Sequence, residues 1–164
     1  MRALHLANII INYAIDMNKP VTHSELQGIL YALDLAHLKE YGSRLIEEHY
    51  LASVNGPRLQ SIYEKFSFYN RKIKLRRKDK HKLPDYCASD IERQINDLIN
   101  LDTLDIISRG VLENSPWSKI YTRKNSSDRI RHIPNSLLLE YVIDTEKINS
   151  TKESKNKNKN LIIN

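Results

Sequence analysis

A Thr-x-x-Glu pattern at residues 22–25 constrains the fold of this chain most, because it fixes where a long helix begins. In such a capping box the hydroxyl and the carboxylate each satisfy an otherwise unpaired backbone N–H group at the helix start. Apolar residues then recur at helical spacing until Gly42, which favours the left-handed backbone that ends a helix. The sequence therefore predicts a helix from residue 22 to about residue 41. Its expected buried stripe consists of Leu26, Ile29, Leu30, Leu33, His37 and Leu38.

Helices are also predicted on both sides of this one. Apolar residues recur at helical spacing over residues 4–14, and the pattern stops at residues 18–20, where Asn and Lys precede Pro. After residue 43 the helical period is lost, and Asn-Gly-Pro at residues 55–57 indicates a sharp turn. Pro57 is then expected in the first turn of a short helix. The predicted apolar face of that helix consists of Leu59, Ile62, Tyr63 and Phe66.

The second half of the chain carries shorter helix signals. A Ser-x-x-Glu pattern at residues 89–92 predicts another capped helix start. Ser-Pro-Trp at residues 115–117 fits an N-cap, a first helical position and a buried aromatic residue. Further helices are predicted over residues 104–109 and 135–143. The apolar face predicted after residue 89 consists of Ile91, Ile95, Leu98 and Ile99.

Composition and patterning together indicate a mainly α, compact single-domain fold. The 164 residues are 40% hydrophobic, which is enough for one core without a disulfide or a structural metal. Residues 145–164 hold few apolar side chains, so they bury too little surface to offset the entropy of ordering. We therefore expect a helical domain over residues 1–144 and a disordered Lys/Asn-rich tail over residues 145–164. No stretch approaches the roughly 20 apolar residues of a membrane span, so we expect a cytoplasmic protein without a membrane partner.

Positive charge is concentrated in residues 71–82. This run holds eight Lys or Arg against one Asp, a local charge of +7, whereas the whole chain has a formal charge of +6. Ile73 and Leu75 alternate with basic residues, which would place both on one face of a short strand or of a β-hairpin around residues 68–82. The run is a candidate contact for phosphates or for an acidic protein face, and a solvated loop is the alternative. The candidate nucleic-acid-binding residues are Arg71, Lys72, Lys74, Arg76, Arg77 and Lys78.

The sequence contains no pattern typical of catalysis, cofactor binding or metal binding. His37 lies on an apolar stripe without a second ligand at helical spacing, so we expect an interior histidine held by hydrogen bonds. Cys87 is the single cysteine, which excludes an internal disulfide. His81 and Lys82 are near it in sequence and could lower the pKa of its thiol. A catalytic cysteine also needs an oriented base, and nothing in the sequence identifies one. We therefore expect a protein that is not an enzyme and has no catalytic residues, no cofactor and no metal.

Three stretches of the first seventy residues resemble the Panacea domain, an antitoxin family that includes GepA-like phage-associated proteins. Residues 3–14 resemble the family's opening helix. Leu-Gln-Gly-Ile-Leu-Tyr-Ala at residues 26–32, preceded by Pro-Val-Thr, resembles its Leu-Gln-Lys-Leu-Leu-Tyr-Tyr helix. Residues 52–63, with Ala-Ser-Val-Asn-Gly-Pro and a later Ile-Tyr, resemble its Ala-Trp-x-x-Gly-Pro and Val-Tyr. A weaker similarity lies at residues 115–117, where the family has Pro-Trp.

The resemblance implies an antitoxin of phage or mobile-element origin that neutralises a cognate toxin or binds another host or phage protein. Neutralisation would be direct or through delivery to a protease, and the alternative function is a nucleic-acid-binding regulator that uses the basic run. Ser53 stands where the family has Trp, and Ser108-Arg109 where it has Thr-His, so a different partner is expected if those positions contact one. Gly28 replaces the family's Lys inside a helix, which suggests either the close approach of another backbone or a divergent copy of the family. The partner-binding positions that the resemblance implies are Leu26, Tyr31, Gly56, Pro57, Tyr63 and Trp117.

Overall fold

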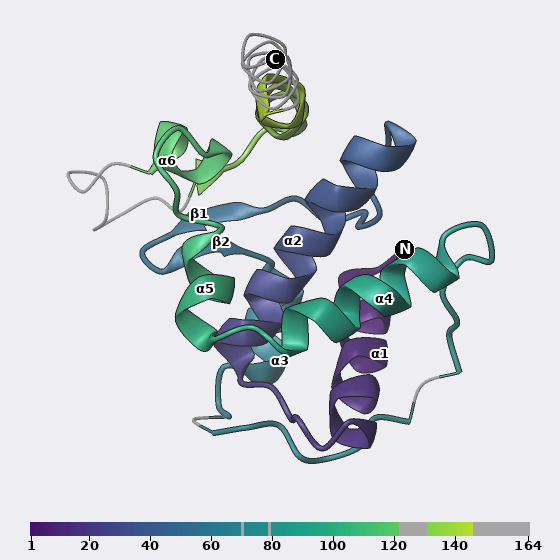
Figure 1. The fold of residues 1–164 in the computed structure, drawn as a ribbon. Helices are drawn as coiled ribbons and strands as arrows, with labels where there is room; N and C mark the ends of the chain where they lie inside the picture. Colours follow the sequence, from purple (N-terminus) through teal and green to yellow (C-terminus); the bar gives the residue numbers. More distant parts are fainter. Residues whose placement is uncertain (70, 79, 122–130, 146–164) are drawn as a thin grey trace, which may run out of the picture.

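The computed structural model describes residues 1–69, 71–78, 80–121 and 131–145, so the predicted tail lies outside it apart from its first residue. The mainly α fold expected from the sequence is confirmed (Figure 1). Residues 135–145 are helical and follow the other elements. In chain order these are α1 (Ala3–Asp16), α2 (His23–Tyr41), β1 (Leu51–Ser53), β2 (Gly56–Arg58), α3 (Gln60–Phe66), α4 (Ala88–Ile99), α5 (Thr103–Ser108), α6 (Pro116–Ile120) and β3 (Arg131–His132).

Helix α2 is the central element of the fold. Figure 1 shows it in the middle of the molecule, and it contacts α1, α4 and α5. The predicted capping box is confirmed: the Glu25 N–H donates to the Thr22 hydroxyl, and the Thr22 N–H donates to the Glu25 carboxylate. The helix ends as predicted at Gly42, which has a left-handed φ of 68°. All six residues of the predicted stripe are buried, so this helix contributes one side of the core.

Gly28 allows α5 to lie directly against α2. A Cβ atom at Gly28 would lie 2.8 Å from the Cγ2 atom of Ile106 and 3.1 Å from its carbonyl oxygen. The prediction that another backbone approaches this glycine closely is therefore confirmed. The contact also positions the chain that follows α5, which forms one wall of the cleft described below.

We expect Gly28→Ala to lower the free energy of unfolding by ~1–2 kcal/mol. Alanine gains about 1 kcal/mol over glycine in helix propensity, but overpacking a filled contact costs about 1–3 kcal/mol. The upper part of that range applies, because the new methyl group would meet a carbonyl oxygen and a carbon next to the Ile106 branch point. Urea denaturation followed by circular dichroism measures the change. A variant more stable than the wild-type protein would contradict the close packing.

Strands β1 and β2 form a hairpin, which β3 extends to a three-stranded antiparallel sheet in the order β2-β1-β3. A turn at residues 54 and 55 confirms the sharp turn predicted there, and Gly56 follows it with a φ of 117°. The prediction that Pro57 begins a helix is wrong, because Pro57 lies in β2 opposite Ala52. As an edge strand, β2 tolerates a proline, since its missing N–H would point away from the sheet.

The start of α4 differs from the prediction. The capping box expected at residues 89–92 is wrong, because the helix begins at Ala88 and its N-cap residue, Cys87, makes no side-chain capping bond. Asp90 in the first turn instead accepts hydrogen bonds from Tyr41 and Arg93. The four apolar residues predicted for the inner face of this helix are all buried.

The start of α6 is confirmed. The N–H of Ser118 donates to the hydroxyl of Ser115, the N-cap residue, and Pro116 opens the helix. The helices predicted over residues 104–109 and 135–143 correspond to α5 and to the helical residues 135–145.

The segment between α3 and α4 carries the basic run and passes around the lower end of α1 in Figure 1. The strand or hairpin predicted around residues 68–82 is wrong, because the described residues of this segment form no strand. Ile73 is fully buried and its N–H donates to the Val21 carbonyl oxygen at 2.7 Å, whereas Leu75 is 61% exposed. The two apolar side chains therefore do not share a face.

The backbone of this segment pairs with α1 instead of with itself. The Arg77 N–H donates to Asn12 Oδ1 at 2.8 Å, and Asn12 Nδ2 donates to the Arg77 carbonyl oxygen at 3.0 Å. These bonds satisfy groups that a hairpin would have paired across two strands. The basic run is therefore fixed on the body of the domain at this point.

Candidate partner-binding cleft

A cleft of about 730 Å³ lies between the first half of α2, the β1–β2 hairpin, α3 and the chain from α5 to α6. Glycines 28 and 110 lie in its walls. We call it the aromatic cleft. The side chains that define it are His23, Tyr31, Pro57, Arg58, Tyr63 and Trp117.

A buried polar clamp fixes one wall of the aromatic cleft. Gln27 Nε2 donates to the Leu59 carbonyl oxygen at 3.1 Å, and the Leu59 N–H donates to Gln27 Oε1 at 3.0 Å. Both hydrogen bonds are buried, so the start of α3 is held against α2 by groups that water does not reach. Because α3 carries Tyr63, the clamp also sets the position of that ring.

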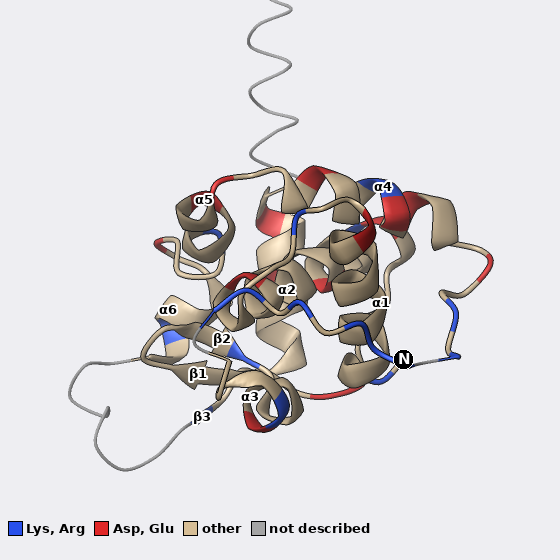
Figure 2. Ribbon diagram, turned by 90° about the horizontal axis from the view of Figure 1, so that it is seen from below, with Lys and Arg blue, Asp and Glu red and all other residues tan. Residues whose placement is uncertain are grey.

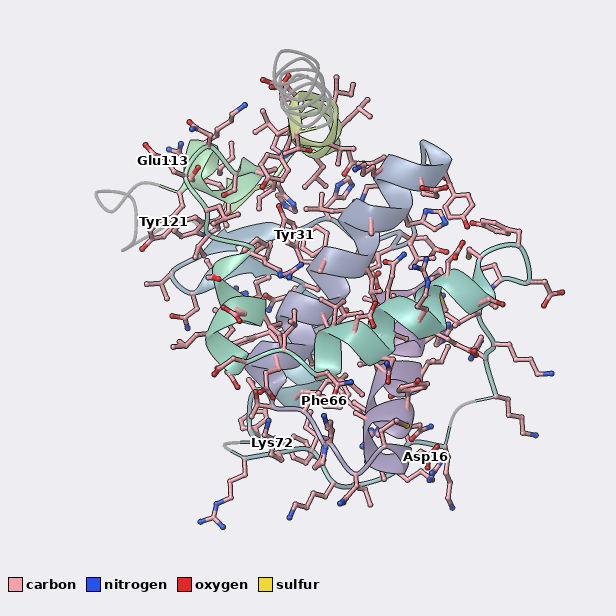
Figure 3. All side chains as sticks on the ribbon, in the orientation of Figure 1. Asp16, Tyr31, Phe66, Lys72, Glu113 and Tyr121 are labelled. Atoms are coloured by element: carbon pink, nitrogen blue, oxygen red, sulfur yellow. The ribbon has the colours of Figure 1, made fainter. Side chains whose placement is uncertain are left out.

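Trp117 fixes the opposite wall. Its indole N–H donates to the Ser53 carbonyl oxygen at 2.7 Å, and its ring stacks on Tyr121 with 4.7 Å between the centroids. Figure 3 shows Tyr121 at the α6 end of the molecule. Gly110 packs against the hairpin, because a Cβ atom there would lie 2.8 Å from Pro57 Cδ. The chain from α5 to α6 is therefore packed directly on the hairpin.

Arg58 carries the positive charge of the cleft. Its guanidinium carbon lies 4.4 Å from the centroid of the Tyr63 ring, and its buried Nε atom has no hydrogen-bond partner among the described residues. No Asp or Glu is among the described residues that line the cleft. Burial and, secondly, the charge of Arg58 lower the pKa of His23, whose ring meets Tyr63 edge to face. A cation and an unsatisfied buried donor therefore lie beside aromatic rings.

Four of the six positions that the family resemblance implied line the aromatic cleft: Tyr31, Pro57, Tyr63 and Trp117. They come from α2, β2, α3 and α6, so the fold brings together residues that are far apart in the sequence. The other two do not line it: Leu26 is fully buried in the core and Gly56 is buried in β2.

Tyr31 connects the cleft to the core. It is 2% exposed, and its ring packs edge to face on Tyr50 with 5.1 Å between the centroids. Figure 3 shows its side chain between α2 and the strands. Burial raises the pKa of the Tyr31 hydroxyl, which has no hydrogen-bond partner in the described part of the chain. Most of this side chain is therefore structural, and a small part of it reaches the cleft.

The sequence analysis missed His23 and Arg58. His23 lies inside the capping box, where the pattern explains its neighbours and assigns nothing to its own ring. Arg58 follows directly after the Gly-Pro of the family motif, which marks the turn and assigns no role to this residue. Neither residue belongs to a run of charged residues or to a motif with regular spacing. Their proximity therefore depends on the tertiary fold.

Three of the six candidate nucleic-acid-binding residues have partners within the chain. Lys72 Nζ lies 2.7 Å from a carboxylate oxygen of Glu25, and Arg76 forms an ion pair with Asp16. Arg77 is half-buried, and its guanidinium lies over an aromatic ring. Figure 2 shows the blue positions of the run spread along an extended segment rather than gathered on one helix face, and Figure 3 labels Lys72 and Asp16. Arg71, Lys74 and Lys78 are exposed and form no ion pair with another described residue.

A second, more open cleft of about 870 Å³ borders the basic run. Its charged lining is mixed, because Lys19, Lys72 and Lys74 lie there together with Glu25 and Asp102. Carboxylates beside the lysines oppose the binding of a phosphate backbone, which needs uncompensated positive charge. This cleft therefore adds little to the case for nucleic acid.

His37 and Cys87 have structural environments. His37 Nδ1 lies 2.7 Å from the Ser43 carbonyl oxygen and Nε2 lies 2.9 Å from the Tyr86 hydroxyl, which confirms the predicted interior histidine. Burial raises the pKa of the Cys87 thiol more than a hydrogen bond from Tyr86 lowers it. The idea that neighbouring basic residues lower that pKa is therefore wrong. Within the described ranges, no three His, Cys, Asp or Glu side chains are placed to hold a metal ion.

Comparison with protein families places most of the chain in a known family. The family model described as Antitoxin SocA-like, Panacea domain, matches residues 26–162, which is most of the chain. No curated protein and no solved structure matches significantly. Among the described helices, none is long and apolar enough to cross a membrane.

Proposed function

Because the chain belongs to the antitoxin SocA-like family with the Panacea domain, we propose that it binds and neutralises a cognate toxin protein through the aromatic cleft. The observation that supports this most directly is the convergence of Tyr31, Pro57, Tyr63 and Trp117 on one cleft. The few residues that dominate binding at protein interfaces are enriched in Trp, Tyr and Arg. A cleft with aromatic walls fits inserted side chains of a partner.

In this proposal the protein acts in the cytoplasm without catalysing a reaction. A bound toxin is inactivated either because the complex covers its functional surface or because the complex delivers it to a protease. Both routes begin with the same stable complex, so the cleft is needed in each. An activity assay of the purified toxin with the purified antitoxin distinguishes the two routes. Covering inhibits the toxin in the absence of a protease, whereas delivery to a protease does not.

We expect the product of the neighbouring gene to form a stoichiometric, salt-resistant complex with this protein and to stop arresting growth when the two are co-expressed. Tyr63→Ala should weaken the complex by roughly 30-fold, since truncating an aromatic side chain at the centre of an interface costs about 2 kcal/mol. Isothermal titration calorimetry measures the affinity. Tyr63 is 40% exposed, so its ring is available to a partner.

Phe68→Ala is the matched control for this variant. Phe68 is 86% exposed and is not among the residues that line the cleft, so its removal should leave the affinity unchanged. Equal losses from both substitutions would place the interface elsewhere. If co-expression of the wild-type protein fails to restore growth, the proposed neutralisation is wrong.

The alternative function, a nucleic-acid-binding regulator, depends on the exposed residues Arg71, Lys74 and Lys78. Its affinity for duplex or single-stranded DNA should fall steeply with added salt, because each neutralised phosphate releases counterions. Reversing these three charges should abolish that binding without affecting the toxin complex. DNA binding that survives the reversal would exclude the basic run as its site.

A further inference from the structure

We propose that Arg58 is the receptor for an Asp or Glu side chain of the toxin segment that enters the aromatic cleft. The inference rests on the function proposed above and names the chemistry of the partner at that site. It depends on the unsatisfied state of Arg58, on the charges around it and on the shape of the cleft on either side.

Arg58 is placed to receive an anion. In the described part of the chain no carboxylate forms an ion pair with it, and its buried Nε atom donates no hydrogen bond. The guanidinium carbon lies 4.4 Å from the centroid of the Tyr63 ring, so the ring packs against one face of the guanidinium. A planar guanidinium matches a carboxylate with two parallel hydrogen bonds. Because Nε is buried, a carboxylate in the cleft would pair with the two terminal NH₂ groups, which make no hydrogen bond to another described residue.

The charges around Arg58 favour a single carboxylate over a nucleic acid. The titratable groups that line the cleft are His23 and Tyr31 on α2, Arg58 on β2 and Tyr63 on α3, and none of them is a carboxylate. The basic residues from 71 to 82 are not among the residues that line it. A phosphate backbone is held by several cations along its length, whereas this cleft offers one permanent cation.

The shape of the cleft favours a side chain over the end of a chain. Arg58 and Tyr63 lie at the end of the hairpin that continues into α3, whereas Val54 and the Ser53 carbonyl oxygen bound by Trp117 lie at its turn. The lining therefore extends along the hairpin from Arg58 to the turn, which suits a segment of several residues better than the last residue of a chain. Pairing with β2 as an added strand is blocked, because Pro57 in that short edge strand has no N–H to donate. Recognition must then come from side chains, with an acidic group on Arg58 and apolar groups on the aromatic walls.

The test uses overlapping blocked peptides that tile the product of the neighbouring gene, each compared with a twin in which Asp and Glu are replaced by Asn and Gln. Trp117 is the single tryptophan of the chain and lines the cleft, so its fluorescence and its indole N–H resonance report on this site. We expect one peptide to perturb Trp117 and its amide twin to bind roughly tenfold more weakly or worse, as lost charge-assisted hydrogen bonds require. Amide twins that bind as tightly as the acidic peptides overturn the proposal.

Arg58→Gln should remove the preference for the acidic peptide, and Arg58→Lys should retain part of it, because lysine keeps the charge without the fork. Circular dichroism checks that both variants fold. A reciprocal exchange, Arg58→Glu with the toxin carboxylate changed to Arg, should restore part of the binding even where the single variants are weakened. An Arg58→Gln protein that keeps the full preference overturns the assignment of Arg58.

Failure of this inference differs from failure of the proposed function. If the wild-type protein forms the toxin complex and Arg58→Gln neutralises the toxin equally well, the function stands and the carboxylate receptor is wrong. If the wild-type protein forms no complex with the toxin, the proposed function itself fails. Binding of single-stranded DNA that perturbs Trp117 and is lost in Arg58→Gln would instead assign the cleft to nucleic acid and overturn the peptide proposal.

Discussion

Asp34→Asn is expected to lower the free energy of unfolding by about 3–5 kcal/mol, the usual cost of removing one partner from a buried ion pair. Asp34 is 2% exposed in α2. Its Oδ1 atom accepts hydrogen bonds from the N–H groups of Leu45 and Ile46 at 2.8 and 3.0 Å. Its Oδ2 atom accepts two from the Arg44 guanidinium at 2.9 and 2.6 Å. One carboxylate therefore fixes the chain that leaves α2 toward β1.

The asparagine amide cannot reproduce this arrangement, although its size is almost the same. Asp34 accepts at both oxygens, whereas asparagine has one oxygen and one NH₂ donor. If the NH₂ group faces the backbone, two buried N–H groups lose their acceptor; if it faces Arg44, a donor meets a guanidinium. The side chain of Arg44 is 10% exposed, so its charge would stay largely buried without a counter-ion.

Urea denaturation of Asp34→Asn and of Asp97→Asn measures the effect against a matched control. Asp97 carries the same chemical change on the exposed face of α4, where substitutions usually stay within about 0.5 kcal/mol. Equal stability of the two variants would contradict the structural role of Asp34.

Sequence reasoning predicted the helices best where a local signal defines both ends. Residues 22–25 and Gly42 define α2 by hydrogen bonds and backbone geometry within a few residues, and both signals are present in the structure. The second capping-box prediction was wrong because a Ser-x-x-Glu pattern does not by itself fix the first residue of a helix. Tertiary contacts can place the start of the helix at another residue. There, the hydroxyl of Tyr41 in α2 donates a hydrogen bond to Asp90 in the first turn of α4.

The hairpin and the basic run depended on contacts that the sequence does not display. Strands of three residues are too short to show an alternating pattern, and Pro57 in β2 reads locally as a helix start. The alternation of Ile73 and Leu75 indicated a strand, but only Ile73 is buried, and its N–H pairs with the Val21 carbonyl oxygen instead of with a second strand. The burial of Asp34 could be inferred from the sequence, because it lies four residues before Leu38 of the predicted stripe and therefore on the same helix face.

The aromatic cleft could be predicted in part. The family resemblance supplied Tyr63 and Trp117, whose proximity to Pro57 then depended on the chain from α5 to α6 packing over the hairpin. Arg58 and His23 could not be found, because an isolated cation has no periodicity and its function depends on which carboxylates the fold places nearby.

Glu25 links three segments through one carboxylate, and its replacement has the second large expected effect. It accepts hydrogen bonds from Lys72 Nζ at 2.8 and 2.7 Å, from the Thr103 hydroxyl and from the Thr22 N–H. Burial by itself raises the pKa of Glu25, but these hydrogen bonds outweigh it and lower the pKa from 4.5 to about 2. The ionised form of Glu25 is therefore favoured more strongly in the folded chain than in the unfolded chain.

The sign of the pH dependence follows from that lowered pKa. Since the folded state holds the proton less tightly than the unfolded state, the stability that Glu25 contributes is fully present above pH 4.5 and is lost as the pH falls toward 2. At about 1.4 kcal/mol per pKa unit, the difference corresponds to about 3 kcal/mol. The loss should also free Lys72 and the start of α5 from the start of α2.

Glu25→Gln should therefore cost about 3 kcal/mol at neutral pH and should flatten the acid side of the stability curve. The variant and the wild-type protein should approach each other as the pH falls from 4.5 toward 2, because the wild-type carboxylate becomes neutral there. Glu92→Gln on the exposed face of α4 is the control, and its curve should run parallel to that of the wild-type protein. A Glu25→Gln variant with an unchanged acid slope would mean that other carboxylates cause the acid sensitivity and that Glu25 does not join the three segments in solution.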